Sequence, residues 1–183
     1  MTLSLLDKEN TGLVVLDVQE RLMEVMGQNE RTLDNITKLL QLSRLFDLPL
    51  ILTEQYPRWL GSTVPEIKQL LSVYEPIEKM DFNCCNVAPF NSRLESTGVK
   101  SLILVGVETH ICIFQTCFSL LKRGYEVHVP QDAVDSRTCE NWTVGLGLMR
   151  DSGAVITSTE TVVYQILERV GSKKFKEMLK IIK

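Results

Sequence analysis

The sequence predicts a three-layer α/β/α domain built on an open parallel sheet of six strands. Short apolar runs alternate with stretches of helical period, the chain of 183 residues has the size of one domain, and 44% of its residues are hydrophobic. At this size roughly 70% of the surface of the unfolded chain can be buried without disulfides or a structural metal. Because crossovers between parallel strands are right-handed, helices cover both faces of such a sheet. We expect one domain over residues 1–183 with the strand order 3-2-1-4-5-6.

The period of the apolar residues assigns each element. Continuous runs such as GLVVL and SLILV are typical of strands buried on both faces, whereas apolar residues three and four apart indicate helices. Thr157 and Glu160 have the spacing of a capping box. The expected strands cover residues 12–16, 48–53, 74–79, 101–105, 125–129 and 154–156. The expected helices cover residues 31–46, 64–73, 87–97, 111–123, 140–151, 157–170 and 172–183.

Charge and cysteine usage exclude several function classes. A net charge of −3 argues against nucleic acid as the main partner, because phosphate backbones require clustered Lys and Arg. The five cysteines form no CxxC pair and only two histidines accompany them, so we expect free thiols, no metal site and a cytoplasmic protein. We expect neither a targeting segment nor a membrane span. Phosphate-binding glycine motifs follow none of the expected strands, which disfavours a nucleotide-binding domain.

Three residues at the carboxyl ends of expected strands are candidates for chemistry, because ligands of such sheets bind where the strand order reverses. They are Asp17, Lys79 and Cys112. Cys112 lies in the expected first turn of a helix, where the helix dipole and a nearby Lys79 would favour a thiolate. Asp17 would accept the thiol proton and return it to a leaving group. The backbone N–H groups of Glu108 and Cys112 would hold a developing oxyanion.

Each of these residue types also has a structural interpretation. An Asp after a strand is often a turn residue, an edge Lys is often a solvated charge, and a Cys in an apolar helix is often packed core, as we expect for Cys117 and Cys139. A Cys–His pair is disfavoured because His110 is only two residues from Cys112 and points elsewhere on a helical turn. We expect His128 to be a packed residue of its strand.

Several segments together resemble one family. LVVLDVQ at residues 13–19, EKMDF at 78–82 and LVGVETHICIFQT at 104–116 resemble, in order and spacing, the motif blocks of the isochorismatase-like cysteine hydrolase superfamily. TEQYPRWLGSTVPEI at 53–67 and FKEMLKIIK at 175–183 are most similar to the isochorismatase domain-containing proteins of eukaryotes. The resemblance covers essentially the whole chain.

The resemblance implies roles for individual residues. Asp17 matches the acid/base aspartate of the family, Lys79 its lysine and Cys112 its nucleophile, and a cis peptide bond is implied before Glu108. Members of this type usually hydrolyse small amides or N-carbamoyl compounds through an acyl-enzyme, without a cofactor, whereas others cleave the vinyl ether of isochorismate. Homo-oligomers are common in the family.

The chain also departs from the family pattern. Nicotinamidases bind a metal through an Asp and His cluster after the second strand, but TEQYPRWLGS has no histidine here, so we expect no catalytic metal. Leu22 replaces a common aromatic residue, and Glu108 stands where nicotinamidases carry a small residue. Gln19, Tyr56 and Trp59 are candidates to line the remodelled pocket, although Trp59 would equally pack under its loop. We therefore expect a metal-independent cysteine hydrolase of a small amide-type substrate; the alternative is a catalytically idle scaffold.

Overall fold

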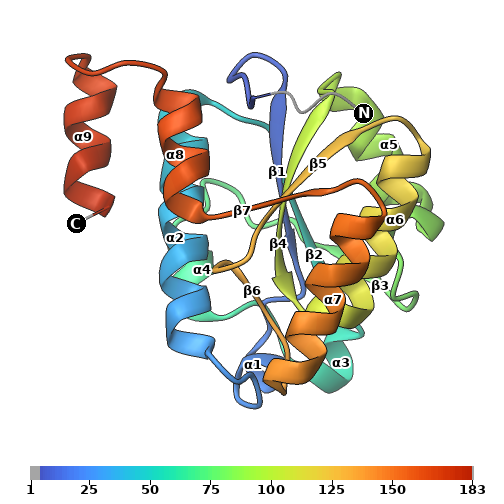
Figure 1. Cartoon of the computed structure of the whole chain (residues 1–183). Helices are drawn as coiled ribbons and strands as arrows, with labels where there is room; N and C mark the ends of the chain where they lie inside the picture. The colour runs from blue at the N-terminus through green and yellow to red at the C-terminus, as the bar shows by residue number, and fades with distance from the viewer. Residues whose placement is uncertain (1–4, 183) are drawn as a thin grey trace.

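A seven-stranded parallel sheet forms the middle layer of the computed structural model, which describes residues 5–182 (Figure 1). Its strands are β1 Thr11–Leu16, β2 Leu50–Gln55, β3 Ile77–Lys79, β4 Ser101–Val107, β5 Glu126–Pro130, β6 Val134–Asp135 and β7 Val155–Thr157. The strand order is β3-β2-β1-β4-β5-β7, and β6 pairs with β4 outside this path. The predicted layers and strand order are confirmed, and only β6 was missed. It has two residues, too few to form an apolar run. Residues 1–4 and 183, at the ends of the expected domain, lie outside the described residues.

Helices cover both faces of the sheet. In Figure 1, α2 and α8 pack on one face, and α5, α6 and α7 pack on the other. The helices are α1 Glu20–Met23, α2 Asn29–Phe46, α3 Pro57–Leu60, α4 Pro65–Lys68, α5 Ala88–Thr97, α6 Phe114–Lys122, α7 Cys139–Asp151, α8 Thr159–Leu167 and α9 Lys173–Ile182, with a 3-10 helix η1 at Cys84–Asn86 and a π-helix η2 at Thr109–Ile113. Among residues 5–182, no helix combines the length and apolar character that a membrane crossing needs.

The sheet separates two hydrophobic cores. Because side chains alternate along a strand, Leu13 and Val15 of β1 enter the core beneath α2 and α8, whereas Val14 and Leu16 enter the core beneath α5, α6 and α7. All six residues of β1 are buried. This burial on both faces explains the continuous apolar run from which the strand was predicted.

Some predicted boundaries differ from the structure. The helix expected over residues 64–73 is only the four-residue α4, and the expected loop before it contains α3. The capping box at Thr157 is wrong, because Thr157 still belongs to β7. Ser158 caps α8 instead: its backbone is extended, and its hydroxyl accepts a hydrogen bond from the N–H of Thr161 at 3.2 Å.

Candidate active site

The carboxyl ends of four neighbouring strands meet at one edge of the sheet. Leu16 at the end of β1 pairs with Thr53 of β2 on one side and with Gly106 of β4 on the other. Lys79, the last residue of β3, pairs with Gln55, the last residue of β2. Asp17 directly follows β1, so its side chain starts between the ends of β2 and β4.

Gly106 allows β4 to approach the end of β1 closely. It has a φ of +117°, and a Cβ placed on it would lie 2.0 Å from the carbonyl oxygen of Leu16. Every other residue type would push the two strands apart here. This close approach brings Asp17 beside η2, the segment that follows β4 and carries Cys112.

The three predicted residues are brought together by these strand ends. Nζ of Lys79 donates to Oδ2 of Asp17 at 2.7 Å and lies 3.7 Å from Sγ of Cys112. The side chains of Asp17 and Lys79 have no exposed surface, so their ion pair is fully buried. Thr53 supports the second carboxylate oxygen of Asp17, to which its hydroxyl donates at 2.7 Å.

The electrostatics of the site favour a protonated thiol at rest. Burial, followed by the charge of Asp17, raises the pKa of the Cys112 thiol, and the ammonium of Lys79 offsets only part of this. The thiol hydrogen-bonds to Asp17. Burial opposes the charge of Lys79, but the interactions of Lys79 with Asp17 and Cys112 outweigh this effect and raise the Lys79 pKa. Burial therefore opposes the resting thiolate that was expected from the helix dipole and Lys79.

The segment around Cys112 is held from two sides. The Val107–Glu108 peptide bond is cis, as the resemblance implied, and Oε2 of Glu108 accepts from Nε of Arg137 at 3.1 Å. On the other side, Gly145 of α7 lies against η2: a Cβ on it would be 2.9 Å from backbone atoms of His110. His110 itself contacts the hydroxyl of Ser136 through Nδ1 at 3.0 Å.

The three candidate pocket residues lie in different surroundings. Gln19 is fully buried, and its amide is occupied by backbone groups of Gln55 and Gly61. Tyr56 and Trp59 are exposed, by 42% and 64%. Trp59 is therefore not packed under its loop, and the guanidinium of Arg21 lies 5.8 Å from its ring centroid.

Two site residues were missed by the sequence analysis, Thr53 as a partner of Asp17 and Gln55 as a partner of Lys79. Oε1 of Gln55 accepts from Nζ of Lys79 at 2.6 Å. The strand was expected to end at Thr53, and the polar residues after it were assigned to a loop. The available signal was the strand-end rule itself, applied to β2 as it was applied to its neighbours.

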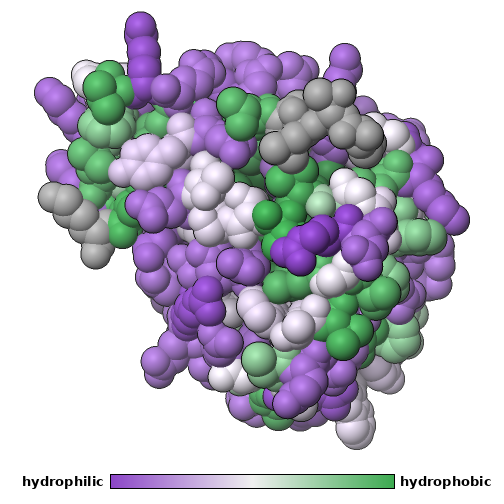
Figure 2. Space-filling model, viewed as in Figure 1, coloured by the Kyte–Doolittle hydropathy of each residue, from purple (hydrophilic) through white to green (hydrophobic). Residues whose placement is uncertain are grey.

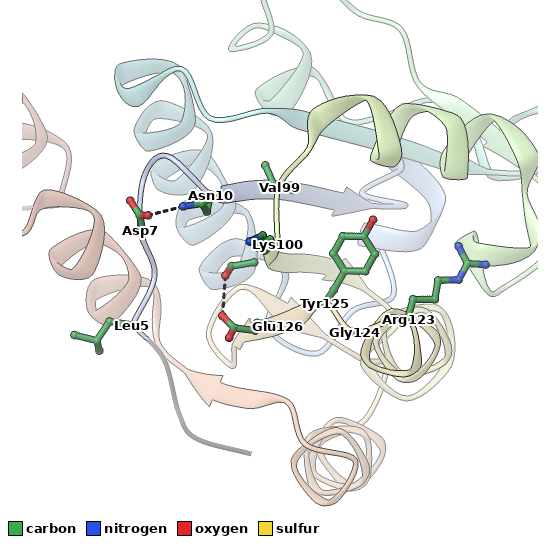
Figure 3. A pocket seen from close by; sticks show the side chains of 10 residues that line it. Leu5, Asp7, Asn10, Val99, Lys100, Arg123, Gly124, Tyr125 and Glu126 are labelled. Atoms are coloured by element: carbon green, nitrogen blue, oxygen red, sulfur yellow. Dashed lines mark hydrogen bonds between the residues drawn. The ribbon is translucent and has the colours of Figure 1, made fainter.

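A cavity lies at the opposite end of the strands, away from Asp17, Lys79 and Cys112. This cavity has a volume of about 510 Å³ and is lined among others by Asn10, Lys100, Tyr125 and Glu126 (Figure 3). These residues lie near the amino ends of β1, β4 and β5, whereas Asp17 follows the carboxyl end of β1. In the described part of the chain, no group of three or more His, Cys, Asp or Glu side chains is arranged to hold a metal ion.

Comparisons with known proteins identify the family. The isochorismatase domain model matches residues 11–161. The chain is 37% identical over 177 residues to the secreted isochorismatase effector Isc1 of Phytophthora sojae, a match that covers 93% of this chain and 83% of that protein. It is 34% identical over 177 residues to isochorismatase domain-containing protein 2A of Mus musculus, covering 96% and 84% of the two chains. The structure of MAR1 ribonuclease from Caenorhabditis elegans superposes with a TM-score of 0.92 at 34% identity, covering 98% of this chain and 92% of that one. With a matching domain model and relatives above 30% identity over nearly its whole length, the chain belongs to the isochorismatase family.

Proposed function

We infer that the protein is a metal-independent cysteine hydrolase that cleaves the C–N bond of a small amide or N-carbamoyl compound. One observation carries this proposal: Asp17, Lys79 and Cys112 come from three different strand ends, and the ammonium of Lys79 contacts the other two side chains. A nucleophile, a proton acceptor and a fixed positive charge are the groups that acyl transfer requires.

In the first half-reaction the sulfur of Cys112 attacks the substrate carbonyl carbon while its proton moves to Asp17. The carbonyl oxygen becomes an oxyanion, which the N–H groups of Glu108 and Cys112 stabilise. Asp17 then gives the proton to the leaving nitrogen, the C–N bond breaks, and an acyl thioester remains on Cys112.

In the second half-reaction water replaces the amine. Asp17 takes a proton from the attacking water, the C–S bond of the tetrahedral intermediate breaks, and the proton returns to the sulfur of Cys112. The product carboxyl compound leaves and the protonated thiol is restored. Lys79 stays charged throughout, because its ion pair with Asp17 and its contact with Cys112 outweigh the burial that opposes the ammonium form.

Turnover of a panel of small amides, N-carbamoyl compounds and isochorismate tests this proposal. Cys112→Ala should abolish turnover of any substrate found, and a slow substrate should leave a mass increase on the peptide that contains Cys112. Cys117→Ala is a matched control, because Cys117 is also a buried cysteine, lies five residues along the chain and faces the core beneath α6. Full turnover by Cys112→Ala would overturn the covalent mechanism.

The same experiments also test two other functions. If the protein is a catalytically idle scaffold, no compound in the panel is hydrolysed. Cys112→Ala should then leave the binding of partners unchanged. The relative from C. elegans is named a ribonuclease, so RNA belongs in the panel. We favour the amide reaction because the net charge is −3 and no histidine contacts Asp17, Lys79 or Cys112 among the described residues.

Assembly and location complete the proposal. We propose that residues 1–183 form one domain and that the protein is a homo-oligomer. Assembly is supported by α7, which carries the exposed apolar side chains of Val144 and Leu148. Figure 2 shows apolar surface over this part of the molecule. A relative from Escherichia coli at 22% identity is described as an octameric hydrolase. All five cysteines are free, which supports a reducing compartment such as the cytoplasm.

A further inference from the structure

The ammonium of Lys79 has more acceptors around it than it has protons. Nζ lies 2.7 Å from Oδ2 of Asp17, 2.6 Å from Oε1 of Gln55, 3.3 Å from the carbonyl oxygen of Asp81 and 3.7 Å from Sγ of Cys112. An ammonium donates three N–H bonds. Two of them are used in the short bonds to Asp17 and Gln55, so the third is left for the Asp81 carbonyl and the sulfur. The rotation of the ammonium is therefore set by two contacts, one of which is Gln55.

The amide of Gln55 has one orientation that satisfies its neighbours. Its Nε2 donates to the carbonyl oxygen of Met80 at 2.8 Å, while its Oε1 accepts from Lys79. A flipped amide would place its two protons against the ammonium and its oxygen against the Met80 carbonyl. Gln55 consequently always presents an acceptor to Lys79.

Gln19 in turn holds the backbone of Gln55. The amide oxygen of Gln19 accepts from the N–H of Gln55 at 2.7 Å, and its Nε2 donates to the carbonyl oxygen of Gln55 at 3.0 Å. The same nitrogen donates to the carbonyl of Gly61 at 2.6 Å. Gln19 is fully buried, so these bonds are shielded from water. A polar path thus runs from Gln19 through Gln55 to Lys79.

We propose that Gln55 is a positioning residue that keeps one N–H of Lys79 directed at the sulfur of Cys112, and that Gln19 holds Gln55 in place. The proposal rests on the proposed function, because Gln55 has this role only if Lys79 acts on Cys112. An uncharged acceptor is suited to this role, because it orients the ammonium without a second negative charge that would oppose a thiolate. Gln55 acts through Lys79 and does not react with the substrate.

Alkylation of Cys112 by iodoacetamide tests the proposal without a substrate. Rates are measured from about pH 6 to about pH 10 by peptide mass spectrometry, and the exposed Cys139 serves as an internal reference. Gln55→Met keeps the length of the side chain and removes the amide. The curve of Cys112 alkylation rate against pH should move to higher pH by at least about half a unit in this variant. Where the rate rises with pH, this shift makes alkylation about threefold slower at a fixed pH. Cys139 should react as before.

The direction of the change separates positioning from loosening of the fold. If Gln55→Met only loosens the site, Cys112 becomes more exposed and its alkylation becomes faster, which would overturn the proposal. A pH dependence of Cys112 alkylation identical to that of the parent protein would overturn it as well. Gln41→Met is the matched control, since the Gln41 amide lies on α2 and donates to the carbonyl of Thr37 on the same helix; its curve should not move.

Two further variants keep the result decisive. Gln55→Leu also removes the acceptor for Lys79 and replaces Gln55→Met if that variant does not fold; an unshifted Cys112 curve in this variant would refute the positioning role. Lys79→Met removes the ammonium itself. If Lys79→Met leaves the Cys112 curve unchanged, the proposed function fails. If Lys79→Met shifts the curve and the Gln55 variants do not, only the positioning of Lys79 by Gln55 fails.

Discussion

The buried ion pair between Asp17 and Lys79 predicts a specific pattern of stability changes. Removal of one partner of a fully buried pair leaves an uncompensated charge and typically costs about 3–5 kcal/mol. Lys79→Met should therefore lower the free energy of unfolding by about that amount, because the buried Asp17 carboxylate loses its ammonium partner and keeps neutral donors such as the hydroxyl of Thr53. With a urea slope of about 2 kcal/mol/M, the unfolding midpoint should fall by about 1.5–2.5 M.

Removal of both charges should recover part of this loss. The double variant Asp17→Asn/Lys79→Met buries no charge at this position, so it should be more stable than Lys79→Met alone. Asn is the suitable replacement because Asp17 has a φ of +56°, which Asn tolerates better than most residues. This inverted order, with two substitutions less harmful than one, is specific to a buried pair.

Urea denaturation followed by circular dichroism measures these differences, and a second ion pair supplies the control. Lys38 and Asp34 on α2 are also 2.7 Å apart, but 62% of the Asp34 side chain is exposed. Lys38→Met should therefore cost no more than about 1 kcal/mol. A loss of less than about 1 kcal/mol for Lys79→Met, together with a double variant that is no more stable, would refute the reasoning.

Three further predictions concern other parts of the molecule. Gly145→Ala should lower turnover and destabilise the fold by about 1–3 kcal/mol, because its Cβ would meet the backbone of His110; Gly147→Ala, two residues along α7 with open space around it, should be neutral or stabilising in the same urea titration. Burial lowers the pKa of His128, and neither ring nitrogen has a hydrogen-bond partner within residues 5–182. The unfolded chain therefore binds the proton more readily, so stability should fall as the pH drops below about 6.5, and unfolding titrations of His128→Val should lack this component. Trp59→Ala should change the free energy of unfolding by less than about 1 kcal/mol, since the side chain is 64% exposed, while raising KM if Trp59 contacts substrate.

The sequence was sufficient where one local pattern decides the structure. The apolar runs place β1 and β4, and the strand-end rule then selects Asp17 and the segment with Cys112 without any knowledge of side-chain contacts. Lys79 was selected in the same way, although only three residues of its expected six-residue strand pair with β2. The motif blocks of the family add the roles of these residues.

Other features depend on contacts between distant residues and could not be predicted. The polar end of β2 has the composition of a loop, and Gln55 is buried only because Lys79 and Met80, more than twenty residues away, supply its partners. Gln19 was expected only as a candidate to line the substrate pocket. In the structure, backbone groups from β2 and its following loop take up its whole amide, and no spacing in the sequence specifies that.

The protonated resting thiol changes how the proposed reaction begins. At rest the site holds one negative charge on Asp17, one positive charge on Lys79 and a neutral Cys112. When the thiol proton moves to Asp17, the negative charge passes to the sulfur, and the net charge of the buried site stays the same. Lys79 contacts both the carboxylate and the sulfur, so its ammonium faces the negative charge before and after the transfer. The proposed reaction therefore does not require a low thiol pKa. It requires that the ammonium of Lys79 remains in contact with both the Asp17 carboxylate and the Cys112 sulfur. Gln55 and the carbonyl of Asp81, which also accept from this ammonium, are proposed to keep it there.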